Sequence, residues 1–346
     1  GENRVIARFG LDRIKRSPLH GLRALVDASG LGGANIDTWD CGFKLAPRLN
    51  ACGRMAHARE AVEMLTTADP KRAAEIAAEL SRLNTERRLV ERRIFEQAAE
   101  MAVQAGMTGE DRRAIVLAHP EWHAGVVGIV CSRLVERFGR PTILMADREG
   151  VCHGSGRSID GFNLHAGLHA CADVLDKFGG HDMAAGLALQ SARLPELVDR
   201  FTAVANERIS PEELTPVLHI DAAARAADLS LTEVRRVEAL APFGRGNPPV
   251  AVMLKGAVID AAPVPLGSGG RHLALVVRDG EAPATAPGAR TPASRVLRLV
   301  GWGWGEGPHR QRLARGMTID AVVRPNVSTY LGRESVEPEL LDLRAR

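Results

Sequence analysis

Four short stretches of the sequence combine residue types that bind phosphate. The first, residues 47–55, contains Arg48, Asn50 and Arg54, with a glycine between the last two. Guanidinium groups bind phosphate oxygens in pairs, and a nearby glycine lets the backbone approach an anion closely. Taken alone, surface arginines that form ordinary salt bridges are the commoner explanation for this stretch.

The second stretch, residues 154–158, follows a run that predicts a β-strand. Ser155 and Ser158 supply two hydroxyl groups, Arg157 supplies a guanidinium, and Gly156 exposes backbone N–H groups. Such a run is typical of a phosphate-binding nest. The same composition also occurs in plain turns, so the residues alone favour neither interpretation.

The third stretch places His181 directly after Gly179 and Gly180. A histidine on exposed backbone can reach a ligand as a hydrogen-bond donor and support catalysis, but a lone histidine is more often structural. The neighbouring Asp182 is placed to orient the ring. The spacing of these residues predicts no metal site.

The fourth stretch, residues 119–130, leads a polar loop into the start of a predicted helix. His123 and Gly125 lie at that start, where backbone N–H groups and partial positive charge favour anions. Gly125 and Gly128 also permit close packing of the helix. Anion binding and packing are weighed equally here.

Other catalytic motifs are missing from the sequence. There is no Gly-x-x-x-x-Gly-Lys-Ser/Thr, no Gly-x-Ser-x-Gly, no His-Glu-x-x-His and no Asp-His-His. Phosphodiester hydrolysis usually needs metals held by clustered carboxylates and histidines. The sequence therefore predicts no metal site and no catalytic residue of its own, and hydrolysis by this chain alone is not expected.

Composition limits the class of protein. The 346 residues suggest about two domains, and a net charge of +3 excludes a globally basic protein, so a polyanion must meet a local groove. No apolar run is long enough for a membrane helix. The five scattered cysteines predict neither disulfides nor a zinc site and favour the cytoplasm. The chain opens without Met, which we interpret as a fragment of a longer protein.

A long helix is predicted to start at Asp69-Pro70, an N-cap followed by proline at the first helical position. Apolar residues then recur every three or four positions as far as Gly106, which gives a helix of about 35 residues and about 50 Å. Arg87-Arg88 and Arg92-Arg93 lie on it. A solvated face with Glu86 and Glu91 is favoured over DNA contact.

The remaining elements fall into two groups. Alternating strands and helices predict a layered α/β domain: strands 114–118, 142–146, from 151, and 184–190, and helices 126–138, 164–175 and 194–209. Short strands then predict a small β-barrel: 217–220, 250–254, 272–278, 296–302, 318–323 and 338–343, with a helix at 231–240. Residues 280–294 predict a mobile loop. Trp302 and Trp304 alternate onto one strand face as candidates for base stacking, with burial in the barrel core as the alternative.

In this order, the four stretches resemble the RecJ branch of the DHH/DHHA1 phosphoesterase superfamily, and the resemblance covers essentially the whole chain. A fifth motif resembles the start of the OB-fold barrel of that branch. Two departures are Cys52, where the family usually carries alanine, and the insertion at 280–294. The motifs are Pro47–Met55, Trp122–Val130, Ser155–Ser158, Gly179–His181 and Ala241–Pro248.

The resemblance implies an α/β fold. It divides the chain into a remnant of a DHH domain (1–68), a connector helix (69–106), a DHHA1 domain (107–210) and an OB-fold β-barrel (211–346). It also implies that Arg54, Ser155, Arg157, Ser158 and His181 hold DNA phosphates opposite Mn²⁺ or Mg²⁺, whose ligands lie upstream of this chain.

The function implied is a 5′→3′ exonuclease specific for single-stranded DNA, in DNA repair and recombination. The partners implied are single-stranded DNA and a single-strand-binding protein, with no membrane, and the chain is expected to be a monomer. Two alternatives remain. One is a DHH/DHHA1 phosphodiesterase that cleaves short oligonucleotides or cyclic dinucleotides, and the other is a non-catalytic module that binds single strands.

Overall fold

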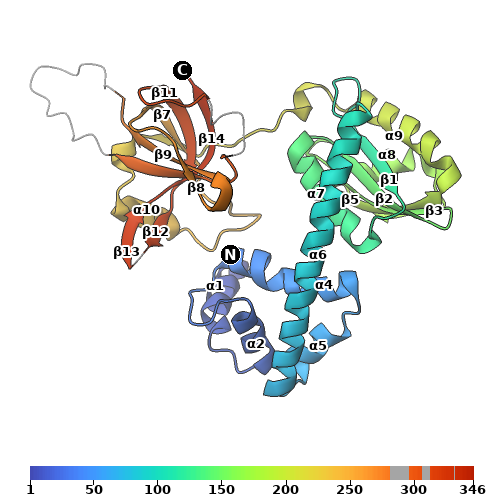
Figure 1. The fold of residues 1–346 in the computed structure, drawn as a ribbon, viewed down its shortest axis with the longest axis horizontal. Helices are drawn as coiled ribbons and strands as arrows, with labels where there is room; N and C mark the ends of the chain where they lie inside the picture. The colour runs from blue at the N-terminus through green and yellow to red at the C-terminus, as the bar shows by residue number, and fades with distance from the viewer. Residues whose placement is uncertain (281–295, 306–311, 331) are drawn as a thin grey trace, which may run out of the picture. The chain divides into compact units, whose positions relative to one another are not determined.

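The computed structural model describes residues 1–280, 296–305, 312–330 and 332–346, which form two compact units (Figure 1). The first unit is Gly1–Val217 and the second is Leu218–Arg346. The loop predicted over 280–294 lies outside the described residues except for Gly280. None of the helices in the described residues combines the length and apolar composition that crossing a bilayer would require.

Short helices form the beginning of the first unit and pack on the start of a long helix, α6. Leu25, Met64, Ile76 and Leu80 are buried between them. The elements are α1 (Glu2–Ile14), α2 (His20–Ala28), α3 (Thr38–Asp40), the π-helical turn η1 (Cys41–Leu45), α4 (Ala46–Met55), α5 (Arg59–Thr66) and α6 (Pro70–Gln104).

Helix α6 confirms the long helix that the sequence predicts. The Asp69 carboxylate accepts a hydrogen bond from the N–H of Arg72 at 2.9 Å, and Pro70 occupies the first turn. The chain leaves the helix at Ala105 and turns at Gly106, where φ is +66°. The helix spans both halves of the first unit, because its start packs on α2 and α4 and its end packs on α7 and β1 (Figure 1).

The second half of the first unit is a five-stranded sheet in the order β1-β2-β3-β5-β4. The pair β1–β2 is parallel and the other pairs are antiparallel. The elements are β1 (Ile115–His119), α7 (Ala124–Phe138), β2 (Thr142–Arg148), β3 (Val151–Arg157), α8 (Leu164–His169), η2 (Ala172–Val174), β4 (Lys177–Gly180), β5 (Ala184–Gln190), η3 (Ser191–Arg193), α9 (Leu194–Arg208) and η4 (Glu212–Leu214).

Two details of this half differ from the prediction. The helix predicted over 164–175 ends at His169 and is followed by a 3-10 turn, which buries both Cys171 and Val174. Strand β4 was not predicted because half of it is Gly179-Gly180, and glycine is depleted in strands. All five cysteines are free.

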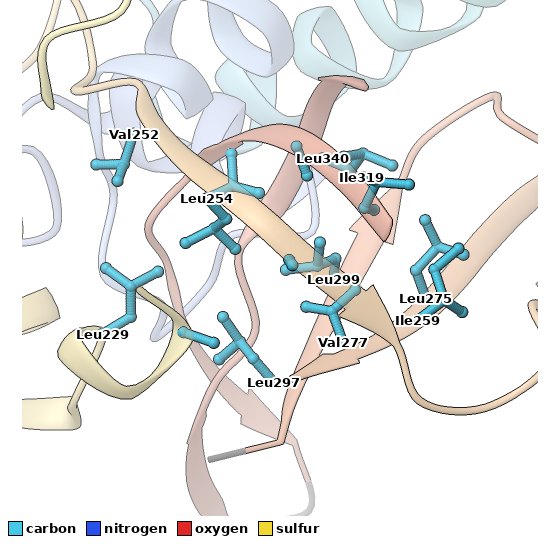
Figure 2. Close-up of a cluster of buried hydrophobic side chains, with 14 of the residues drawn as sticks. Leu229, Val252, Leu254, Ile259, Leu275, Val277, Leu297, Leu299, Ile319 and Leu340 are labelled. Carbon is cyan, nitrogen blue, oxygen red and sulfur yellow. The ribbon is translucent and has the colours of Figure 1, made fainter. Parts of the chain in front are cut away.

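The second unit contains a closed barrel of strands β7, β11, β14, β10 and β9, with β7 also pairing with β9. Figure 2 shows Leu254, Leu275 and Leu299 among the side chains that fill its interior. The elements are β6 (Ala222–Ala224), η5 (Ala226–Asp228), α10 (Leu231–Glu238), β7 (Val252–Ile259), β8 (Val264–Leu266), η6 (Ser268–Gly270), β9 (His272–Arg278), β10 (Leu297–Gly301), β11 (Thr318–Arg324), β12 (Val327–Tyr330), β13 (Arg333–Val336) and β14 (Glu339–Ala345).

The barrel confirms the predicted α/β fold with a C-terminal OB-type barrel, but one strand prediction is wrong. Residues 217–220 form no strand, and the side chain of Val217 is 76% exposed. The chain first joins the sheet at β6, where Ala222–Ala224 run parallel to β7. In the sequence, an apolar run that lies outside the core looks like a strand, because neither its hydrophobic period nor its composition shows whether it is buried.

Candidate functional site

Successive side chains of strand β3 point to opposite faces of the sheet. Gly154 and Gly156 face α8 and α9, because a Cβ on Gly156 would lie 3.0 Å from a methyl group of Leu164. Ser155 and Arg157 point the other way, toward α7, and we name that side of the sheet the α7 face. A Cβ on Gly128 of α7 would lie 3.3 Å from Ser155 Oγ and 3.4 Å from a guanidinium nitrogen of Arg157.

Helix α4 brings Arg54 to the same place. Its guanidinium donates a hydrogen bond to the carbonyl oxygen of Gly125 at 3.1 Å. A Cβ on Gly125 would lie only 2.4 Å from the carbonyl oxygen of Arg54, so glycine is required where α4 meets α7. The first, second and fourth stretches of the sequence therefore meet beside α7.

The arginines at this meeting point carry charge that the chain does not neutralise. Burial lowers the pKa of Arg54, and the positive charges of Arg87 and then Arg157 lower it further, while Glu91 opposes them. Arg157 donates to the carbonyl oxygen of Gly156 at 2.7 Å. Within the described residues, neither Arg54 nor Arg157 pairs with a carboxylate. Two half-buried cations this close favour binding of an anion.

Arg87 was expected on a solvated face, and that prediction is wrong. It is buried, donates to Asn84 Oδ1 at 3.1 Å and pairs with Glu91 at 2.7 Å. Glu91 also pairs with Arg133 of α7 at 3.3 Å. The charges of Arg87 and Glu91 therefore act on Arg54, which the sequence did not predict, and Glu91 joins α6 to α7 through Arg133.

Arg48 and Asn50 lie elsewhere on α4. Arg48 donates to the carbonyl oxygen of Lys44 at 2.7 Å and to Ser81 Oγ at 3.1 Å, so it joins α4 to α6. Burial and then the charge of Arg88 lower the pKa of Arg48. Asn50 is exposed. Within the part of the chain that the structure describes, no hydrogen bond or ion pair joins either residue to Arg54 or Arg157, and their phosphate role stays a prediction.

Ser158 and Gly156 have structural roles within the first unit. The buried hydroxyl of Ser158 donates to the carbonyl oxygen of Phe162 at 2.6 Å, and its N–H donates to that of Met183 at 3.1 Å. Gly156 is buried against Leu164. Within residues 155–158, the side chains that face the site are therefore those of Ser155 and Arg157.

Strand β4 ends at the glycine pair, and His181 follows it directly. Strand β5 lies between this end of β4 and Arg157 of β3. The N–H of His181 donates to the carbonyl oxygen of Ala184 at 2.8 Å, and Ala184 is the β5 partner of Arg157. Two strand spacings separate their backbones, which is about 10 Å. Gly180 has a φ of +149°, and a Cβ there would lie 2.4 Å from that carbonyl, so the turn requires glycine.

The side chain of His181 is exposed and is not oriented by Asp182. The Asp182 carboxylate instead accepts a hydrogen bond from Asn163 Nδ2 at 2.6 Å. Gly179 lies on the α7 face, where it pairs with Gly186 of β5. His181 and Gly179 are thus positioned around Arg157, and their contact with a ligand stays a prediction.

At the start of α7, packing explains the residues better than an anion site does. His123 caps the helix and its Nδ1 accepts a hydrogen bond from the N–H of Gly125 at 3.2 Å. The N–H groups of Val126 and Val127 donate to the carbonyl oxygen of His123. The first N–H groups of the helix are therefore largely occupied within the chain.

The two tryptophans do not share a strand face, so that prediction is wrong. Strand β10 ends at Gly301, and the chain turns through Gly303 with φ +80°. Trp302 is 60% exposed and its ring lies edge-on to that of His272 at 4.9 Å. Trp304 packs against the barrel core. Exposure leaves Trp302 as the candidate for base stacking.

A divalent metal does not fit the residues that the structure describes. Across 1–280, 296–305, 312–330 and 332–346, no group of three or more His, Cys, Asp or Glu side chains is placed to hold a metal ion. The site beside α7 is made of arginines, hydroxyls and glycines. Its chemistry is to bind and position an anion.

Models of known domain families match two parts of the chain. A DHHA1 domain model matches residues 111–210, which contain the five-stranded sheet. A model named RecJ OB domain matches residues 220–342, which contain the barrel.

Known proteins match the chain over nearly its full length. A Bacillus subtilis protein named single-stranded-DNA-specific exonuclease RecJ is 40% identical over 344 residues, covering 98% of this chain and 41% of the relative. A crystal structure of RecJ from Thermus thermophilus in complex with Mn²⁺ has a TM-score of 0.82 at 30% identity, covering 99% of this chain and 47% of that one. The Mg²⁺ complex gives a TM-score of 0.80 at 30% identity, covering 99% and 49%. The chain thus spans less than half the length of these relatives.

Proposed function

Because the chain carries a DHHA1 domain followed by a RecJ OB domain and belongs to the RecJ family, we propose that it forms the DNA-holding part of a 5′→3′ exonuclease specific for single-stranded DNA. The observation that carries the proposal is the pair Arg54–Arg157, half-buried and without a carboxylate partner in the described residues. A phosphate of a single strand supplies the missing negative charge.

Each residue of the site would have a role in DNA binding that follows from its position. The guanidinium groups of Arg54 and Arg157 bind the phosphate at the end of the strand, and Ser155 adds a hydroxyl from the same face. His181, across β5, donates to the same strand. Arg87 is buried and paired with Glu91, so it would act on Arg54 only through its charge.

The hydrolytic step itself is assigned outside this chain. Enzymes that cleave phosphodiesters hold their metal ions with clustered carboxylates and histidines, and the described residues contain no such cluster. We propose that Mn²⁺ or Mg²⁺ binds ligands in the remainder of the complete protein, and that residues 1–346 alone bind DNA without cutting it. The solved relatives contain these two ions.

Two other functions fit the site less well. A phosphodiesterase for short oligonucleotides or cyclic dinucleotides would use the same DHHA1 sheet, but it would not need the RecJ OB domain over residues 220–342. A module that only binds single strands would match the isolated chain, whereas the relatives are named exonucleases. We propose DNA repair and recombination in the cytoplasm as the setting, single-strand-binding protein as a partner and a monomer as the working form.

Arg157→Ala in the complete protein tests the proposal. Loss of a charged hydrogen bond costs about 1.5–3 kcal/mol, so DNA degradation at sub-saturating DNA should fall by about 10- to 100-fold. Metal binding, measured by calorimetry, should not change. The control is Arg82→Ala on α6, because Arg82 is exposed and pairs with Glu79 and Glu86. Unchanged turnover by the Arg157 variant would contradict the proposal.

A further inference from the structure

A glutamine of α6 holds the loop between β1 and α7, residues 119–125. Gln97 Oε1 accepts a hydrogen bond from the indole N–H of Trp122 at 2.9 Å. The amide nitrogen of the same side chain lies 2.9 Å from His119 Nε2. The rings of His119 and Trp122 are stacked with their centroids 5.7 Å apart, so one amide group joins both of them to the helix.

The contact with the indole is buried. Trp122 is 1% exposed and packs with Ile94 and Ala98 of α6 in one apolar cluster. Gln97 and His119 are half-buried. Because water does not reach a buried indole nitrogen, loss of Gln97 would leave that N–H without a partner, which is costly. The position of Trp122 therefore depends on the amide of Gln97.

Hydrogen bonds within the loop extend from these rings to the start of α7. The backbone N–H of Trp122 donates to the carbonyl oxygen of His119 at 3.3 Å, and the N–H of Glu121 donates to His119 Nδ1 at 3.2 Å. His123 comes next and caps α7, and its Nδ1 accepts from the N–H of Gly125 at 3.2 Å. Movement of Trp122 would therefore move Gly125 as well.

Gly125 is the point where this loop meets Arg54. Its carbonyl oxygen accepts the hydrogen bond from the Arg54 guanidinium at 3.1 Å, which is near the upper limit for an N–H···O bond. The two backbones also touch there, since a Cβ on Gly125 would lie 2.4 Å from the carbonyl oxygen of Arg54. A shift of the loop by about half an ångström would break the bond or displace α4.

We propose that Gln97 is a positioning residue for Arg54. It fixes the loop 119–125, and the carbonyl oxygen of Gly125 then holds the guanidinium where it meets a DNA phosphate. A guanidinium that is already held in place loses less conformational freedom on binding and so binds more tightly. The assignment rests on the proposed function, because it concerns the same phosphate site. Gln97 acts through the loop and not by contact with the DNA.

The imidazole of His119 predicts which replacement of Gln97 preserves the loop. An indole N–H can only donate, so the amide oxygen faces Trp122 and the amide nitrogen, also a donor, faces His119 Nε2. The N–H of Glu121 approaches Nδ1, yet a neutral imidazole offers one acceptor nitrogen. In Gln97→Glu the carboxylate would accept from the indole and from Nε2–H, which leaves Nδ1 to accept from Glu121. This variant should keep the loop in place.

A double-mutant cycle on DNA affinity tests the assignment. The probe is a 5′-phosphorylated oligothymidylate of eight nucleotides, bound to the complete protein without metal and followed by fluorescence anisotropy. Gln97→Leu should raise the dissociation constant about fivefold and Arg54→Ala about 10- to 100-fold. The double variant should bind as Arg54→Ala does, because Gln97 acts through Arg54. Additive losses, or an unchanged dissociation constant for Gln97→Leu, would overturn the assignment.

Two further variants separate this role from a purely structural one. Gln97→Glu should bind DNA with wild-type affinity, and a loss equal to that of Gln97→Leu would contradict the hydrogen bonds on which the assignment rests. The matched control is Gln104→Leu, because Gln104 is an exposed glutamine of the same helix that donates to Glu100. It should bind normally, and an equal loss there would also overturn the assignment.

Melting temperatures show that each variant is folded during the titration. If Gln97→Leu melts earlier but binds DNA normally while folded, Gln97 only stabilises the fold and the assignment fails. If Arg54→Ala weakens binding in that case, the proposed function still stands. Normal binding by both Arg54→Ala and Arg157→Ala would instead reject the proposed function, and the assignment of Gln97 with it.

Discussion

The barrel strands and the site beside α7 use arginine in opposite ways. Each arginine on the strands of the seven-stranded sheet pairs with a carboxylate: Arg298 with Glu337 at 2.5 Å, Arg324 with Glu339 at 2.7 Å, and Arg344 with Asp320 at 3.0 Å, while Arg278 reaches Asp260 at 3.3 Å. In the first unit, Arg54 and Arg157 bind only backbone carbonyl oxygens among the described residues.

The difference separates cations that a carboxylate already neutralises from cations that are open to an anion. A guanidinium that already has a carboxylate gains little from a phosphate, because the anion must displace or repel its partner. A half-buried guanidinium without one gains the full interaction and has already lost part of its hydration. Charge alone would therefore not identify the proposed DNA site, since the barrel strands also carry arginines.

The strongest way to break this comparison is to give Arg157 a partner of the barrel type. In Ser155→Asp the new carboxylate lies on the same face two residues away, so it should neutralise Arg157 and repel phosphate. Like-charge contacts cost several kcal/mol, so the dissociation constant for single-stranded DNA should rise about 100-fold or more. Anisotropy titration checks this against Ser155→Ala, which should lose far less. Equal losses would mean that the charge of Arg157 is not what binds DNA.

Removing a partner from the barrel is the reverse change. Asp320 is buried and accepts hydrogen bonds from the Gly256 N–H and from Arg344 and Arg346. Asp320→Asn should lower the free energy of unfolding of the second unit by about 2–3 kcal/mol, because charged hydrogen bonds weaken. The melting transition of the complete protein measures it, with Asp342→Asn, an exposed aspartate of β14, as the control. DNA binding at Arg157 should not change, and a loss there would show that the two kinds of arginine are not independent.

The same aspartate should make the stability of the barrel fall at acidic pH. Burial raises the pKa of Asp320, but the Gly256 N–H and then Arg346 and Arg344 lower it, and the result lies below the ordinary value. A lowered pKa in the folded state means that this stability is complete above the unfolded pKa of about 3.9 and is lost as pH falls through the folded pKa. Acid unfolding of the Asn variant should lack this component.

Local signals in the sequence predict most of the fold. The cap at Asp69, the proline after it and the apolar period define α6, and strands β5 and β9 have their predicted limits because their runs are short and bounded by turns. Strand β4 is not predicted from the sequence, because glycines replace the residues that are typical of a strand. The false strand at 217–220 arises because an apolar run carries no information about whether a neighbour covers it.

The candidate site is predicted less completely. Arg54 and Arg157 are far apart in sequence, and only the family resemblance, not any local pattern, placed them on one wall. For Arg87 a local signal existed: it lies seven residues after Leu80 and seven before Ile94, both buried, so it belongs to the apolar stripe of α6. Reading the run of arginines as one solvated face missed that position.

The prediction with the smallest expected effect is also the most direct test of the difference between paired and unpaired arginines. Each phosphate neutralised by a cation contributes about −0.7 to the slope of log affinity against log salt for single strands. Arg157→Ala should therefore make the slope shallower by about 0.7, whereas Arg298→Ala, which leaves Glu337 unpaired in the barrel, should not. Anisotropy titrations of the complete protein over a series of salt concentrations give both slopes. If the Arg298 variant loses as much slope as the Arg157 variant, a paired guanidinium binds phosphate as well as an unpaired one, and the salt dependence does not distinguish the barrel strands from the site beside α7.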